Sequence, residues 1–147
     1  MAENNETIKA LNFLIGTAID GENGYREAAE EADSSELKAL LTQRGQQRAK
    51  FRSELEAEVE RLGGDPKESG SAGAALHRAW LNVRDAVSGR GDGAIVSESE
   101  RGEKAALDNY EDVLERDLPS DIKTLVARQR SEIEEARAQL EAHRGEA

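Results

Sequence analysis

The sequence has 147 residues and contains no cysteine, and aromatic residues make up only 3% of it. Without cysteine the protein has no disulfide, no thiolate metal site and no cysteine nucleophile. It also has no run of about 20 apolar residues, the length that a membrane-spanning helix needs. The first six residues form neither a basic nor an apolar segment, so no signal peptide is indicated. We therefore expect a soluble, cytoplasmic protein without a membrane partner.

Basic residues are scarce as well, since 20 Lys and Arg stand against 31 Asp and Glu, for a formal net charge of −11. Nucleic acids and anionic membrane surfaces are bound by basic patches, so this balance argues against both as partners. Charges of both signs are interspersed, and the 37% of apolar residues recur at helical spacing. These features predict one folded helical domain over residues 1–147, and they exclude a disordered acidic tail.

Apolar residues recur at steps of three and four along four long segments, which is the pattern of amphipathic helices. We expect these helices at about 5–32, 34–62, 93–117 and 119–140. The segments that join the first helix to the second and the third to the fourth are very short. Each pair must therefore form an antiparallel hairpin.

Local signals mark the helix ends. Asp33 and Glu36 form a capping-box-like start for the second helix, Gly63-Gly64 ends it, and Asp92 is the expected N-cap of the third helix. The long crossover between the hairpins is expected to contain a short extra helix over about 71–87. The fold predicted from these patterns is all-α, a ferritin-like four-helix bundle of two antiparallel hairpins with one long connection.

Two carboxylates fall on the apolar stripes of these helices, Glu22 in the first helix and Glu103 in the third. A carboxylate on a buried stripe must be paired, protonated or bound to a metal. Residues equidistant from a hairpin turn lie at the same height, and Tyr25 and Tyr110 share the two stripes. The same rule gives the rest of a polar layer: Arg44, Gln47 and Arg48 level with Glu22, and Gln129 and Glu132 level with Glu103.

A di-iron carboxylate bundle needs one Glu from each of two helices and Glu-x-x-His from each of the other two. The second helix has two arginines and a glutamine at the required height, and the last helix has no histidine there. We therefore favour an internal salt-bridge layer without a cofactor. In that layer Glu22 pairs with Arg44 or Arg48, and Glu103 binds Gln129, a tyrosine or an arginine from across the bundle. One alternative is an iron or manganese site on Glu22, Glu103 and Glu132, with Glu100 and His77 as less favoured additional ligands. The other alternative is a small-molecule pocket.

Several short motifs occur together along nearly the whole chain: Asp20-x3-Gly24-Tyr25, Gln47-Arg48-x2-Phe51, Gly63-Gly64-x-Pro66, Leu76-His77-Arg78-x-Trp80, Gly102-Glu103 with Tyr110, and Asp117-Leu118-Pro119 with Gln129. In this combination the chain resembles an uncharacterised bacterial ferritin-like family, domain-of-unknown-function family 2383. The resemblance implies a ferritin-like bundle and no particular activity. The iron chemistry of the wider superfamily does not carry over, because Glu-x-x-His is missing at both required positions.

The function expected from these observations is that of a non-catalytic, cytoplasmic helical bundle that acts through protein association. The bacterial setting of the family adds a stress-related role to this expectation. The alternative is a ferritin-like protein with a degenerate or unusual carboxylate metal site, which binds iron or manganese or acts as a weak oxidase. Phe13 and Gly16 lie off the main stripe of the first helix and mark a second buried face, which suits the crossover helix or a homodimer.

Overall fold

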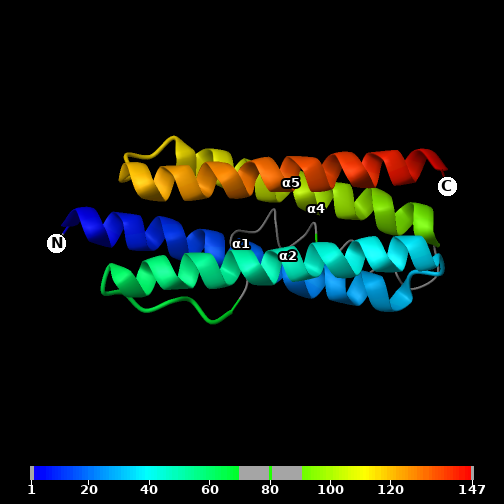
Figure 1. Ribbon diagram of the computed structural model, residues 1–147, viewed down its shortest axis with the longest axis horizontal. Helices are drawn as coiled ribbons and strands as arrows, with labels where there is room; N and C mark the ends of the chain where they lie inside the picture. Colours follow the sequence, from blue (N-terminus) through cyan, green and yellow to red (C-terminus); the bar gives the residue numbers. More distant parts are fainter. Residues whose placement is uncertain (1, 70–79, 81–90, 147) are drawn as a thin grey trace.

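The computed structural model describes residues 2–69, 80 and 91–146, and these residues form four α-helices and no strand (Figure 1). The helices are α1 (Ala2–Glu31), α2 (Ser35–Arg61), α4 (Asp92–Leu114) and α5 (Ser120–Glu146). The all-helical prediction with four long helices is confirmed. The short helix predicted over about 71–87 and His77 lie outside the described residues, of which Trp80 alone falls in that range. Within the described ranges, no helix is long and apolar enough to cross a membrane.

The helices lie side by side as a bundle in which α1 packs mainly against α2, and α4 mainly against α5 (Figure 1). Fewer contacts join the two pairs, and they run chiefly between α1 and α4 and between α2 and α5. Along the first pair, Glu30 lies beside Lys38, whereas Glu22 lies beside Gly45 and Arg52. The two helices therefore run in opposite directions.

The ends of α2 follow from local chemistry. The N-cap is Ser34, whose hydroxyl accepts a hydrogen bond of 3.3 Å from the backbone N–H of Leu37. The sequence pattern placed this role one residue earlier, at Asp33. At the other end Gly63 has a φ of 85°, in the left-handed region where a glycine lacks the Cβ clash, so the predicted glycine stop is observed.

Asp92 does not cap α4 as the sequence predicted. The N-cap is Gly91, and Asp92 is the first residue of the helix. Its carboxylate instead accepts hydrogen bonds of 2.8 and 2.9 Å from the backbone N–H groups of Asp33 and Ser34. Asp92 thus ties the start of α4 to the turn between α1 and α2, a tertiary contact that a local capping rule does not anticipate.

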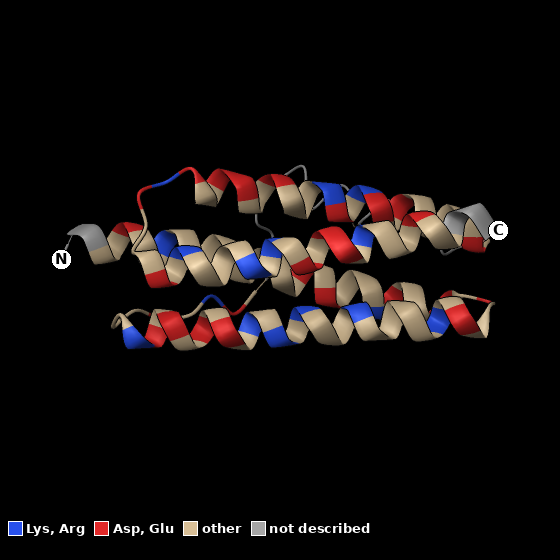
Figure 2. Cartoon of the chain, turned by 45° about the horizontal axis from the view of Figure 1, so that its top comes forward, with Lys and Arg blue, Asp and Glu red and all other residues tan. Residues whose placement is uncertain are grey.

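The core is filled by apolar side chains from all four helices, among them Leu14, Leu41, Leu55, Val113, Val126 and Ile133. Lys, Arg, Asp and Glu are spread over the outer faces of all four helices, with the two signs interspersed (Figure 2). Near the middle of the bundle, however, the core is polar: Arg48, Glu103 and Gln129 are buried there. This polar centre is the candidate site.

Candidate functional site

The polar centre is built on a buried ion pair between Arg48 of α2 and Glu103 of α4. Arg48 Nη1 donates to Glu103 Oε1 at 2.6 Å, and Arg48 Nη2 donates to Oε2 at 2.5 Å. The two side chains are 2% and 0% exposed. A guanidinium fork fits both oxygens of a carboxylate at once, which makes such pairs short and directional. Each buried charge is therefore neutralised by its partner, as burial demands.

Aromatic rings and a glycine hold the Arg48 side chain in place. The guanidinium carbon lies 5.5 Å from the centre of the Tyr25 ring and 5.8 Å from that of Phe51, within cation–π range. A methyl group at Gly21 would lie 3.2 Å from Arg48 Cγ, so the absence of a side chain there leaves room for Arg48 to run along α1. Burial lowers the pKa of Arg48, but the charge and hydrogen bonds of Glu103 outweigh this, and the net pKa is raised. Arg48 remains a cation.

Trp80 closes one side of the polar centre. Its indole packs edge-on against Tyr25, with ring centroids 5.0 Å apart and an interplanar angle of 64°. A methyl group at Gly24 would lie 2.2 Å from this indole, and one at Gly102 would lie 2.8 Å from it. Two glycines, one on α1 and one on α4, therefore leave the space that Trp80 occupies between the helices.

The two tyrosines of the chain differ in their hydrogen bonding. The Tyr110 hydroxyl donates to Gln129 Oε1 at 2.6 Å, whereas the buried Tyr25 hydroxyl has no hydrogen bond of ordinary geometry. Burial is the main cause that raises the pKa of both hydroxyls. For Tyr25, the nearby negative charge of Glu103 raises the pKa further. Both tyrosines therefore stay neutral in the folded protein well beyond ordinary alkaline pH.

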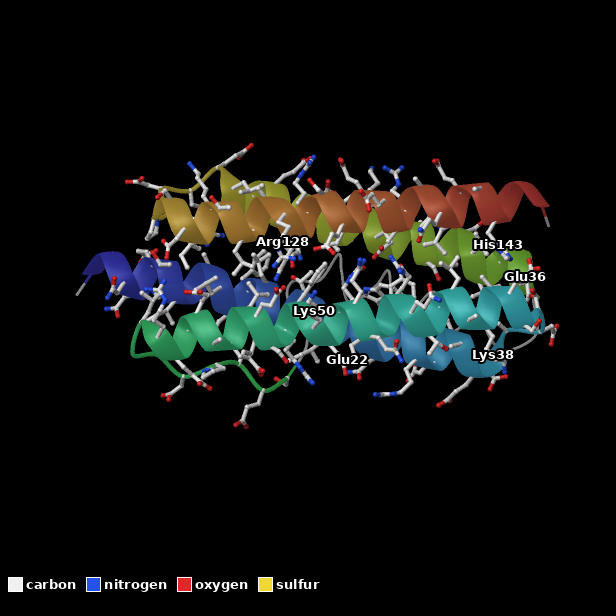
Figure 3. All side chains as sticks on the ribbon, in the orientation of Figure 1. Glu22, Glu36, Lys38, Lys50, Arg128 and His143 are labelled. Carbon is white, nitrogen blue, oxygen red and sulfur yellow. The ribbon has the colours of Figure 1, made fainter. Side chains whose placement is uncertain are left out.

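Gln129 begins a second polar cluster, which joins α5 to α2. Its amide Nε2 donates to Glu54 Oε1 at 3.1 Å, and Arg128 Nη2 donates to Glu54 Oε2 at 2.6 Å. Arg128 Nη1 also donates to Glu132 Oε2 at 2.7 Å on its own helix. Tyr110, Gln129, Glu54 and Arg128 thus connect α4, α5 and α2 in one chain of hydrogen bonds that becomes more exposed toward Arg128. Figure 3 labels Arg128 on α5.

Each of the three carboxylates considered as metal ligands has an arginine as its partner. Glu103 binds Arg48, Glu132 binds Arg128, and Glu22 lies 3.3 Å from Arg52. In the part of the chain that the structure describes, no three His, Asp or Glu side chains are grouped so that they could hold a metal ion. Each of the three carboxylates is therefore neutralised by an arginine within the bundle.

The position of Glu22 differs from the expectation. Its side chain is 22% exposed, and its ion-pair partner is Arg52, not Arg44 or Arg48. Arg48 is engaged by Glu103 across the bundle, so Glu22 is left with the arginine one turn further along α2. Arg44 and Gln47, also predicted in this layer, are half-buried, and Arg44 Nε and Gln47 Oε1 are buried without a hydrogen-bond partner.

Three residues of the site were not found from the sequence pattern. Glu54 and Arg128 lie off the apolar stripes, and they reach the polar layer only because their side chains are long. The sequence motifs place Trp80 in the crossover segment but do not predict its position between α1 and α4. The motifs that contain Gly24 and Gly102 carried the signal for its position, since two glycines facing each other on neighbouring helices leave space for a large ring.

Four long helices around a buried polar centre define this protein as a helical bundle with an internal ion pair. A family model described as "Domain of unknown function (DUF2383)" matches residues 6–116, and the chain belongs to this family. The matched segment includes most of α1 and all of α2 and α4, and with them Arg48, Glu103 and both tyrosines. The membership expected from the sequence motifs is confirmed. No curated protein is significantly similar to the chain.

Proposed function

We propose that this protein is a non-catalytic, cytoplasmic helical bundle of ferritin-like topology that acts through association with protein. The observation that carries the proposal is the Arg48–Glu103 pair. Among the described residues, Glu103 is the only acidic side chain that is fully buried, and both of its oxygens are bound by one guanidinium. The Glu103 carboxylate is thus already neutralised by a fixed cation.

The energetics of this pair favour a structural role. For Glu103 to bind a metal, it would have to release Arg48, which would leave a buried cation without a partner. Removing one partner of a buried ion pair destabilises a protein by about 3–5 kcal/mol. Glu22 and Glu132, the other two candidate ligands, are also engaged by arginines. Metal binding would therefore have to compete with three existing ion pairs.

The connectivity supports a ferritin-like topology. Helix α2 ends at Arg61 and α4 begins at Asp92, so one long connection joins the two helix pairs, whereas short turns join the helices within each pair. A bundle with a single long crossover is the arrangement of ferritin-like folds. Since fold does not determine function, this topology adds no activity to the proposal.

Association is supported by a hollow on the surface. Helices α1 and α2 enclose a groove of about 430 Å³ whose walls are mostly apolar. Exposed apolar surface framed by polar residues is typical of protein-binding sites. The competing function, an iron or manganese site on Glu22, Glu103 and Glu132, has no grouping of these side chains in its favour.

Elemental analysis of protein purified without chelators tests the proposal. We expect iron, manganese and zinc far below one atom per chain, and no heat of binding when Mn²⁺ is titrated into the wild-type protein. Stoichiometric metal that is lost in Glu103→Gln but retained in the surface control Glu135→Gln would overturn it. Because Glu103→Gln also affects folding, the Mn²⁺ titration of the wild type provides an answer that needs no variant.

A further inference from the structure

The groove between α1 and α2 has a floor of small and apolar residues. Ala29 of α1 and Leu41, Gly45 and Ala49 of α2 contribute to it. A methyl group at Gly45 would lie 3.5 Å from Tyr25 Cβ, so α1 and α2 are in close contact at the floor of the groove. Toward the solvent the two helices diverge and leave the groove open between them. All of the lining residues belong to these two helices, and Figure 3 labels Glu22 at one end and Lys38 at the other.

Charged residues form the rim of the groove in a defined order. Along α1 the order is Glu22, Arg26 and Glu30, and across from Glu30 lies Lys38 of α2. Lys38 Nζ donates to the backbone carbonyl of Glu30 at 3.4 Å, which places the two side chains at the same height. Both side chains are exposed, and within the described residues neither forms an ion pair of its own. Their charges remain available to a partner.

We propose that this groove is the interface of a homodimer, in which a second copy of the chain packs its own α1–α2 face onto it. The inference rests on the proposed function, association with protein, and names the partner. A two-fold symmetric interface brings the same patch of both subunits together. The pattern of charges on the rim then decides which of two arrangements can form.

With the two-fold axis parallel to the helices, each α1 lies on the partner's α2 at equal height. Glu30 then meets the partner's Lys38, and Lys38 meets the partner's Glu30, so two complementary pairs form. With the axis across the helices and centred on the groove, α1 lies on the partner's α1. Arg26 then meets the partner's Arg26, and Glu22 meets the partner's Glu30. Like charges in contact disfavour the second arrangement, and the rim selects the first.

Sedimentation analysis of charge-reversed variants tests this arrangement at low ionic strength. We expect a wild-type dimer, and a Kd raised by about tenfold or more in Glu30→Lys and in Lys38→Glu, because each reversal turns two attractive pairs into repulsive ones. When the two variants are mixed, both pairs between the chains become complementary, and a heterodimer of wild-type affinity should form. The controls are Glu135→Lys on α5 and Lys104→Glu on α4, which should leave the Kd unchanged.

The apolar floor is tested separately by Ala49→Glu, which places a charge inside the groove and should abolish the dimer. Ala57→Glu, on an exposed face of the same helix, is the matched control. A strictly monomeric wild type would overturn the homodimer, while the metal analysis would still decide the proposed function. A dimer that persists in Ala49→Glu, or a mixture of the two reversed variants that stays monomeric, would also overturn it.

Discussion

Glu22 and Glu103 occupy equivalent places in the sequence pattern, each on the apolar stripe of the first helix of its pair. In the structure, however, they differ in burial and in the contacts of their carboxylates. Glu103 is fully buried and forms two hydrogen bonds of 2.5–2.6 Å with Arg48. Glu22 is 22% exposed and has a single contact of 3.3 Å with Arg52. The position on a stripe therefore does not decide whether a carboxylate is buried.

The path of one arginine explains the difference. Gly21 stands immediately before Glu22 on α1, and its missing side chain lets Arg48 pass along α1 toward α4. Arg48 therefore reaches Glu103 in the other helix pair and leaves Glu22 partly buried beside Arg52. Because desolvation offsets most of the attraction in a buried ion pair, we expect this contact to fix how the two helix pairs dock more than it adds stability.

The largest effect is expected when Arg48 is removed. Arg48→Met should lower the free energy of unfolding by about 3–5 kcal/mol, because it leaves the Glu103 carboxylate buried without a cation. Arg52→Met, one turn along the same helix, removes the half-exposed pair with Glu22 and should cost less than about 1 kcal/mol. Denaturant unfolding of both variants checks the comparison. Equal losses would mean that the two ion pairs are not as different as their burial indicates.

Alkaline pH tests the protonation of Tyr25 and Tyr110, the two buried tyrosines of the polar centre. Burial raises the pKa of Tyr25 and Tyr110 above the ordinary value of 10.0. Their contribution to stability is therefore complete below about pH 10 and is lost as the pH rises through the folded-state pKa values. Tyr25 and Tyr110 are the only tyrosines in the sequence, so tyrosinate absorbance reports on this site alone.

We expect tyrosinate to form only together with the loss of helical circular dichroism. In guanidinium chloride, where the chain is unfolded, the same absorbance change should occur near pH 10, which serves as the control. Tyrosinate that forms near pH 10 while the helical signal is intact would show that these hydroxyls are accessible to solvent, against the buried arrangement.

Removing the tyrosine hydroxyls one at a time separates the two halves of the polar centre. Tyr110→Phe should lower the free energy of unfolding by about 1–2 kcal/mol, since it leaves Gln129 Oε1 buried without its donor. Tyr25→Phe removes a hydroxyl that has no hydrogen bond of ordinary geometry and lies near the Glu103 carboxylate, and it should change stability by less than about 0.5 kcal/mol. Thermal unfolding followed by circular dichroism measures both. The reverse order of effects would place the hydrogen-bonded tyrosine on α1.

A small effect is also expected at Glu22. Glu22→Gln keeps the size of the side chain and removes only a partly screened attraction to Arg52, so the loss should be below about 1 kcal/mol. Glu103→Gln, the same chemical change at the buried position, should cost several times more. If both variants unfold at the same denaturant concentration, Glu22 is as buried as the sequence pattern suggested.

Much of the fold was predictable from the sequence because amphipathic spacing and turn residues act locally. The four helices and the glycine stop at Gly63 follow from such rules. Arg48, Glu103, Tyr110 and Gln129 were also placed on stripes that meet inside the bundle. In these cases the outcome depends only on the local sequence, which sets where a helix ends and which of its faces points into the bundle.

The sequence pattern gave the wrong partner for Glu22, whereas an arginine from across the bundle was among the partners expected for Glu103, and Arg48 is that partner. Counting from a hairpin turn relates positions only within one pair, so it matched Glu22 with Arg44 or Arg48. The actual pairing depends on how far each arginine extends across the bundle, and Arg48 extends past Gly21 to Glu103. A local capping rule predicts Asp92 as the N-cap of α4, whereas its carboxylate accepts hydrogen bonds from the backbone of the turn between α1 and α2.

We propose that Arg48 and Glu103 form a structural ion pair, and that Glu103 is not a metal ligand with Arg48 merely beside it. A double-mutant cycle of Arg48→Met, Glu103→Leu and the double variant measures this directly by denaturant unfolding. We predict that the double variant is more stable than either single variant, with a coupling free energy of about 3 kcal/mol. Losses that simply add in the double variant would contradict the account.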